Sequence, residues 1–251
     1  MKFATNTALY AATAFVEGMD WARRFRRHEL FDDSLARTCD VARTTIIAPH
    51  GGGIEPGTSE LCLAVAGYHP ATLPQTPPAG TTYDYWMFEG LRKEGNAVLH
   101  VTSTGCDDDV AVSLCGGALH ALALHGFRPD PPDDQVVLVG GGNEPLRLTL
   151  RAALEQAGFK AVDAAGNGEL DGDNECNIVN RTLLGMGVQL ELSTPLREAM
   201  FGEFSRSRRK HTTNQVFWTF VAACRDVLDR QEAERIVPPP CQPAQPTLTM
   251  S

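Results

Sequence analysis

Runs of apolar residues, separated by polar or glycine-rich turns, divide the chain into alternating strands and helices. Residues 41–49 and 96–104 are rich in β-branched residues, and residues 187–193 alternate apolar with polar side chains, so each segment predicts a strand. Residues 118–127 form a further apolar run. These four segments are the expected framework of a sheet.

The clearest local pattern lies between residues 135 and 162. An apolar run is followed by three glycines, Asn143 stands where a helix would be capped, and Pro145 suits the first turn of that helix. Gly158 comes just past its expected end. This order predicts a strand, a tight turn and a helix.

Three other segments have helical character. One helix is expected after Thr58, a candidate N-cap, a short one within residues 84–94, and an amphipathic one within residues 213–232. Residues 69–83 contain four prolines and predict a surface loop.

Strands that alternate with helices are typical of a three-layer α/β fold with a mixed, mainly parallel sheet. We expect one main domain over residues 40–232. Residues 1–39 indicate an N-terminal extension with a helical stretch at residues 21–28, where aromatic and basic residues mix without a period of two. Residues 233–251 are rich in proline and predict a disordered tail.

Composition and charge exclude several classes of protein. Of the 251 residues, 43% are hydrophobic and 21% are charged, as in ordinary folded globular chains. A formal net charge of −9 argues against a general binder of nucleic acids or anionic membranes. No apolar stretch is as long as a membrane helix, and the N-terminus is a poor secretory signal. The default expectation is therefore a cytoplasmic location, with secretion or release by lysis left open.

The seven cysteines are scattered without closely spaced pairs. This spacing favours buried thiols in a reducing compartment over a disulfide framework or a cysteine-rich zinc site.

His50 and Glu55 flank a run of three glycines that follows the strand predicted at residues 41–49. Open α/β sheets place ligands at the carboxyl ends of strands, and glycine permits a close approach of the backbone. An imidazole nitrogen and a carboxylate oxygen are both zinc ligands, and one further histidine would leave a fourth position for water. The pair alone is equally compatible with a polar turn.

Several histidines are available as a third ligand. His125, like His50, ends an apolar run before a glycine, which places it at the edge of the sheet. His100 and His120 are alternatives, although both lie inside apolar runs, where a core or supporting role is the simpler interpretation.

Glu191 lies inside the strand predicted at residues 187–193, between two leucines. A carboxylate in such a place either pairs with a charge or acts on a substrate. A zinc hydrolase needs a base that takes a proton from water, and Glu191 is the candidate. Without a metal site it would be a solvent-facing strand residue.

Two groups of residues are candidates for holding an anionic substrate. Asn180 and Arg181 precede that strand, and arginine can hold a carboxylate through two hydrogen bonds, although a surface salt bridge explains Arg181 equally well. Residues 205–211 form a basic run on an acidic protein. Such a run is either a solvated segment or a surface that steers an anionic polymer.

Six motifs occur in the order found in one known family. They are "APHGGGIEPGTSE", "LHVTST", "LALHGF", "VVLVGG", "NIVNR" and "GVQLELSTPLREAMF". Over about residues 40–232 the sequence resembles the poly-γ-glutamate hydrolases of phages and bacteria. The resemblance implies a zinc peptidase, related in architecture to the zinc carboxypeptidases, that cleaves the γ-glutamyl amide bond of poly-γ-glutamate.

The resemblance also implies a role for individual residues. One zinc ion would be bound by three side chains, one carboxylate would activate water, and two residues would bind the carboxylates of the substrate. In that order these residues are His50, Glu55 and His125, then Glu191, then Asn180 and Arg181.

Some alternatives stay open. His120 remains an alternative to His125, because the segment that contains Gly105 and Cys106 departs from the family pattern. We expect a monomer that acts on an anionic polyamide or a small amide and binds neither nucleic acid nor membranes. The other functions considered are a zinc amidohydrolase for small N-acyl amino acids and a non-catalytic polymer-binding protein of the same fold.

Overall fold

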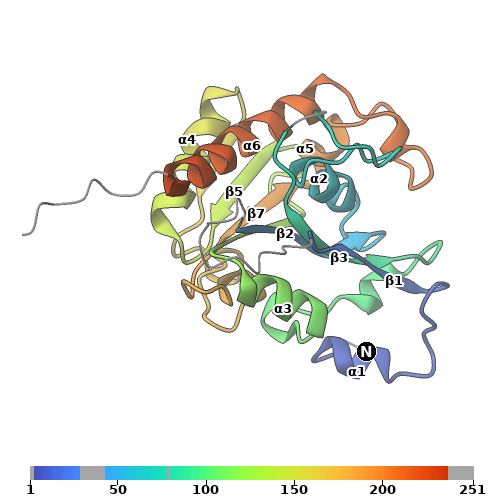
Figure 1. Ribbon diagram of the computed structural model, residues 1–251. Coiled ribbons are helices and arrows are strands. Elements are labelled where there is room, and N and C mark those ends of the chain that lie inside the picture. The colour runs from blue at the N-terminus through green and yellow to red at the C-terminus, as the bar shows by residue number, and fades with distance from the viewer. Residues whose placement is uncertain (1–2, 29–42, 78–79, 237–251) are drawn as a thin grey trace, which may run out of the picture.

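The computed structural model describes residues 3–28, 43–77 and 80–236 (Figure 1). Within these ranges seven strands form one sheet in the order β1-β3-β2-β4-β7-β5-β6. The strands are β1 (Trp21–Arg26), β2 (Thr44–Gly52), β3 (Asp84–Gly90), β4 (His120–Phe127), β5 (Val136–Gly140), β6 (Lys160–Asp163) and β7 (Val188–Ser193).

Six α-helices and five short 3-10 helices are found among the described residues. The α-helices are α1 (Asn6–Tyr10), α2 (Thr58–Val65), α3 (Asp109–Gly117), α4 (Glu144–Gln156), α5 (Thr194–Ala199) and α6 (Gln215–Ile236). The 3-10 helices are η1 (Asn96–Leu99), η2 (Ser103–Gly105), η3 (Gly168–Leu170), η4 (Ile178–Asn180) and η5 (Arg209–His211). In the described part of the chain, no helix has the length and apolar character needed to cross a membrane.

The sheet is mixed but mainly parallel, as the sequence predicts. Strands β3, β2, β4 and β7 run parallel to their neighbours in this central part, and β5 is parallel to β6. The pairs β1 with β3 and β5 with β7 are antiparallel. The carboxyl ends of β2, β4 and β7 therefore lie along one edge.

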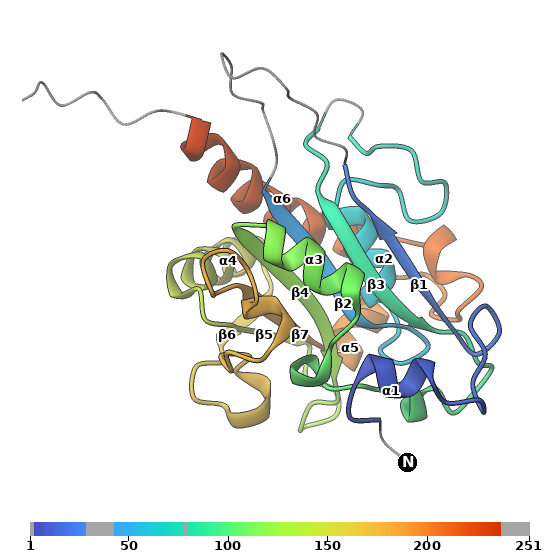
Figure 2. The ribbon, with the colours of Figure 1, turned by 60° about the horizontal axis from the view of Figure 1, so that its bottom comes forward.

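Helices cover both faces of the sheet and make three layers (Figures 1 and 2). On one face α2, α4, α5 and α6 enclose the larger apolar core, in which Phe217 and Phe220 are buried. On the other face α1, α3 and η4 pack on a second core around Trp86 and Phe88. The second face is covered less completely, and the candidate site lies there.

Most of the strongly patterned segments fold as predicted. The strands expected at residues 187–193 and within 118–127 are β7 and β4, and the pattern after residue 135 gives β5 and α4. Asn143 caps α4, because its side chain accepts a hydrogen bond from the Leu146 amide at 3.2 Å. The last predicted helix is α6.

Two predictions for residues 84–104 were wrong. Residues 84–94 do not form a helix, since residues 84–90 are strand β3. The strand was missed because it is buried on both faces, and such a strand has no alternation of apolar and polar residues. Residues 96–104 do not form a strand but contain η1 and η2. Gly95 has a φ of 71°, and the Asn96 side chain bonds both the amide and the carbonyl of Arg92, which closes a turn there.

Two boundaries also differ from the prediction. Strand β2 does not end at Pro49 but continues to Gly52, because a register shift between Ala48 and Gly51 accommodates the proline. Helix α2 is capped by Gly57 rather than by Thr58, which is its first residue.

The expected helical stretch at residues 21–28 was wrong as well. Residues 21–26 are β1, an edge strand of the same sheet, so the N-terminal part contributes directly to the main fold. The boundary expected at residue 39 and the tail expected from residue 237 onward lie outside the described residues, whereas α6 continues to Ile236.

We propose that residues 3–28 fold as one unit with the sheet, and Trp21 tests this. Its side chain is 3% exposed and stacks on Tyr10 and Phe88, with ring centroids 4.5 and 5.6 Å apart. Trp21→Ala should lower the free energy of unfolding by about 3–5 kcal/mol. On the same strand Phe25 is 50% exposed, so Phe25→Ala should change it by only about 0.5 kcal/mol. Denaturant unfolding of both variants checks this, and equal effects would contradict the proposal.

Candidate active site

A polar cavity of about 610 Å³ opens where β2, β4 and β7 end. Its walls come from these strands, from residues 100–104 after β3 and from residues 168–177. Its charged and histidine side chains are His50, Glu55, His100, His125, Asp171, Asp173 and Glu191. The sequence reasoning named four of these seven as site residues.

His50 and Glu55 meet across the glycine turn. His50 Nδ1 and Glu55 Oε1 are 2.8 Å apart, and the Glu55 amide donates to the His50 carbonyl at 2.8 Å, which closes the loop. The two side chains are only 4% and 13% exposed. Burial alone would lower the pKa of His50, but the Glu55 carboxylate raises it. Conversely, burial would raise the pKa of Glu55, but His50 and His125 hold it well below its usual range.

His125 joins this pair from β4. Its Nδ1 lies 3.1 Å from His50 Nδ1 and 3.5 Å from Glu55 Oε2. Glu55 Oε2 also accepts a hydrogen bond from the Gly126 amide at 2.8 Å, which ties the loop to β4. Two ring nitrogens and a carboxylate thus face one another in a small volume.

The surroundings of the two rings indicate which nitrogens face the site. His50 Nε2 lies 2.6 Å from the Val101 carbonyl, which can only accept, so in the neutral ring Nε2 carries the proton and Nδ1 presents a lone pair. His125 Nε2 is 3.2 Å from Ser103 Oγ. Metal-bound histidines generally make such a hydrogen bond through the other ring nitrogen.

The spacing of the three groups suits a zinc ion. Ligands held tetrahedrally about 2.0–2.1 Å from zinc lie roughly 3.3–3.4 Å apart. Distances of 2.8, 3.1 and 3.5 Å between the atoms of His50, Glu55 and His125 are close to this separation. The lone pairs on Nδ1 of the two neutral rings and the negative charge of the Glu55 carboxylate repel one another. A cation between them would remove that repulsion.

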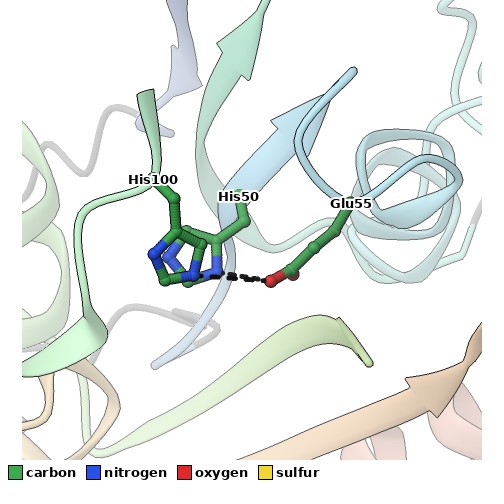
Figure 3. Close-up of side chains that lie close together, drawn as sticks. All are labelled: His50, Glu55 and His100. Carbon is green, nitrogen blue, oxygen red and sulfur yellow. Dashed lines mark hydrogen bonds and ion pairs between the residues drawn. The ribbon is translucent and has the colours of Figure 1, made fainter. Parts of the chain in front are cut away.

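His100 is a second candidate beside the same carboxylate. Figure 3 shows its ring lying over that of His50, and the ring centroids are 3.9 Å apart. His100 Nε2 is 3.8 Å from Glu55 Oε1, and candidate ligand atoms of His50, Glu55 and His100 lie within 4.8 Å of one another. His100 is 32% exposed, whereas His125 is buried at 3%. In the sequence a core or supporting role was the simpler interpretation of His100, because it was expected inside a strand.

Two buried arginines hold the loop that carries His50 and Glu55. Arg209 donates to the Gly52 carbonyl at 3.0 Å, and Arg197 donates to the Pro56 carbonyl at 2.7 Å. Arg197 belongs to α5, on the opposite face of the sheet from the cavity, and also donates to the Leu192 carbonyl at 3.1 Å. Burial lowers the pKa of Arg197. Sequence patterns carried no signal for these backbone contacts.

Glu191 lies beside His125, because the parallel register of β4 and β7 pairs these two residues. Its side chain lines the cavity and its Oε1 accepts a hydrogen bond from Gln189 Nε2 at 2.9 Å. Burial raises its pKa to about 7; His125 opposes this rise and Glu55 adds to it. A carboxyl group of this kind can take up and release a proton near neutral pH.

Asn180 and Arg181 are not among the residues that line the cavity. The Asn180 amide is fully used, since Oδ1 accepts from the amides of Gly142 and Gly187 and Nδ2 donates to the carbonyls of Gly172 and Asn174. Arg181 is exposed and donates to the Cys106 carbonyl at 3.1 Å. Asn180 therefore shapes the cavity wall at residues 172–174 rather than reaching the cavity itself.

His120 begins β4 and pairs in register with Thr44, at the start of β2. His125 lies five positions further along the same strand, which is about 17 Å at roughly 3.3 Å per residue. The structure thus brings His125, and not His120, to His50 and Glu55.

The sequence family follows from comparison with known proteins. The family model described as poly-gamma-glutamate hydrolase matches residues 29–223, which is most of the chain. The chain belongs to this family. The match begins ahead of residue 40, where we expected the main domain to start.

Two relatives of this chain come from Bacillus subtilis (strain 168). The SPbeta prophage-derived UPF0714 protein YoqZ is 37% identical over 186 residues, which is 74% of this chain and 62% of YoqZ. The UPF0714 protein YmaC is 33% identical over 190 residues, 76% of this chain and 74% of YmaC. The chain thus spans less than two thirds of the length of YoqZ.

Two solved structures share the fold of this chain. A bacteriophage poly-gamma-glutamate hydrolase matches with a TM-score of 0.76 at 27% identity and covers 92% of this chain and 98% of its own. The apo, zinc-free form of YndL matches with a TM-score of 0.70 at 30% identity, with coverages of 84% and 91%. Both likenesses confirm the expected three-layer α/β architecture.

Gly52 tests how tightly the loop at His50 is packed. Its φ is 66°, and a Cβ there would meet the Gly90 carbonyl oxygen at 2.5 Å, whereas Gly95, with a φ of 71°, has open space around it. Gly95→Ala should cost about 1–2 kcal/mol for the left-handed backbone alone. Gly52→Ala should cost more, since the backbone of β3 must also move. Denaturant unfolding measures both, and equal costs would show that the β3 contact is unimportant.

Proposed function

We propose that this protein is a zinc-dependent hydrolase that cleaves γ-glutamyl amide bonds of poly-γ-glutamate. The observation that carries the proposal is the convergence of His50, Glu55 and His125 within 3.5 Å, with Glu191 on the adjacent strand of the same cavity. Membership of the family, and the likeness to a bacteriophage enzyme of that name and to a zinc-free form of YndL, support it.

His50, Glu55 and His125 would hold one zinc ion, which would polarise the scissile carbonyl and activate a water molecule. Val101 and Ser103 would orient the two rings through their outer nitrogens. Glu191 would accept the proton of the attacking water and pass it to the leaving amine. Its burial and its raised pKa suit a group that must do both.

The metal ligands can be separated by substitution. His125→Ala and His50→Ala should lose zinc, because each would leave only two of the three close ligands. His100→Ala and His120→Ala should keep one zinc per chain. Elemental analysis of the purified variants measures this. Full zinc in His125→Ala together with loss in His100→Ala would move the third ligand to His100.

Glu191→Gln separates the proton-transfer role from metal binding. This variant should keep its zinc but lose about 10²–10⁴-fold in kcat on poly-γ-glutamate, since the amide cannot accept the proton. Shortening of the polymer is followed by gel filtration. Full activity in Glu191→Gln would remove Glu191 from the mechanism.

Polymer binding by zinc-loaded wild type without any shortening would leave only a non-catalytic binding role, and cleavage of small N-acyl amino acids alone would favour the amidohydrolase.

The walls of the cavity are acidic. Glu55, Asp171, Asp173 and Glu191 line it, whereas no lysine or arginine does so among the described residues. An anionic polymer must therefore be attracted by positive charges outside the cavity. We propose that the basic run at residues 205–211 does this, because its Arg209 is anchored on the Gly52 carbonyl while Arg208 and Lys210 are exposed.

Charge reversal tests the basic run. Lys210→Glu should raise KM for long poly-γ-glutamate about fivefold, through lost electrostatic attraction, and leave a short oligomer unaffected. Added salt should abolish the difference. The matched control is Arg230→Glu, which makes the same change of charge far from His50. Arg230 lies two residues before Glu232, which bonds Thr44 at the start of β2, whereas His50 lies near the end of that strand. An equal rise in KM for both variants would show that only the net charge of the protein matters, and not the position of the basic run.

A further inference from the structure

A buried row of side chains leads from the backbone near η4 to Glu191. Asn177 Nδ2 donates to Gln189 Oε1 at 2.9 Å, and Gln189 Nε2 donates to Glu191 Oε1 at 2.9 Å. The three residues are only 4%, 3% and 6% exposed. None of these contacts involves His50, Glu55 or His125.

The direction of this row is fixed at its far end. The Val179 amide, which can only donate, bonds Asn177 Oδ1 at 3.1 Å. The Gly172 carbonyl, which can only accept, lies 3.5 Å from Asn177 Nδ2. Asn177 must therefore turn its NH₂ group toward Gln189, and Gln189 must turn its own NH₂ group toward Glu191.

The row is also held in place by packing. Gln189 and Glu191 are two residues apart on β7, so both side chains leave the same face of the sheet. Gly172, with a φ of 66°, lies against Gln189, and a Cβ at that glycine would be 3.0 Å from the Gln189 side chain. Gln189 thus has little room to choose another rotamer.

We propose that Gln189 and Asn177 are positioning residues that present Glu191 to the reaction as an aimed hydrogen-bond acceptor. This inference rests on the proposed hydrolase function. In this orientation Gln189 offers Glu191 only N–H groups, so it holds one carboxylate oxygen and leaves the other for proton transfer. Asn177 acts one step further away, by keeping Gln189 in that orientation.

Reversing the direction of the row tests the proposal without touching Glu191. In Asn177→Asp the carboxylate still accepts from the Val179 amide but has no hydrogen for Gln189. The Gln189 amide would then turn over and present its oxygen to Glu191. The expected result on poly-γ-glutamate is a fall in kcat of about tenfold or more, a part of the full general-base effect, with KM and zinc content changed less than twofold.

Gln189→Met is the second variant, because it keeps the length of the side chain and removes its donor. It should give the same fall in kcat at unchanged zinc content. Asn167→Asp is the charge control, since Asn167 is exposed, adjoins the cavity wall at Gly168 and lies outside the lining. It adds the same negative charge and should leave kcat within twofold of wild type.

The outcomes separate this proposal from the proposed function. If Glu191→Gln loses activity but Gln189→Met and Asn177→Asp keep wild-type kcat, the positioning role is overturned and the hydrolase mechanism stands. If Glu191→Gln itself is fully active, the mechanism has failed first. If the row acts only through Glu191, combining Gln189→Met with Glu191→Gln should add no further loss. Additive losses, or loss of zinc in Gln189→Met, would instead indicate general damage to the fold.

Discussion

The parallel pairing of β4 with β7 is the constraint on which the site depends. It fixes His125 beside Glu191 at neighbouring positions on one face of the sheet. A slip of one residue in either strand would turn one of them to the opposite face, into the apolar core. The placement of His125 beside Glu191 is thus set by main-chain hydrogen bonds between the two strands.

The other half of the site depends on a loop instead of a register. His50 and Glu55 are five residues apart. Their loop is held by Ser59 Oγ, which accepts from the Gly52 amide, by Arg197 and Arg209, which donate to loop carbonyls, and by its own closure. Charged hydrogen bonds to buried carbonyls are among the stronger polar contacts in proteins. The loop is consequently a rigid support for two side chains that must meet at one point.

The sequence predicted the fold class and four side chains that line one cavity, but it misread several elements around them. His50, His125 and Glu191 could be found because each ends or interrupts an apolar segment, and Glu55 because it follows His50 across three glycines; both are local signals. β3 was misread because burial on both faces removes the alternation that marks a strand. η1 was misread because its turn depends on the bonding of the Asn96 side chain to the Arg92 backbone, which no apolar pattern marks. Asn180 was assigned to the substrate by resemblance, yet its side chain is consumed by four backbone groups of three loops.

The absence of a side chain at Gly126 allows a residue from the opposite layer of the molecule to support the site. A Cβ at that position would lie 2.5 Å from the Arg197 guanidinium carbon, so only glycine lets the arginine of α5 press against β4 while Gly126 donates to Glu55. The site therefore has a rear support built from the opposite layer of the molecule, which no ligand in the cavity can touch. Helix α5 thus takes part in holding the site, although none of its residues lines the cavity.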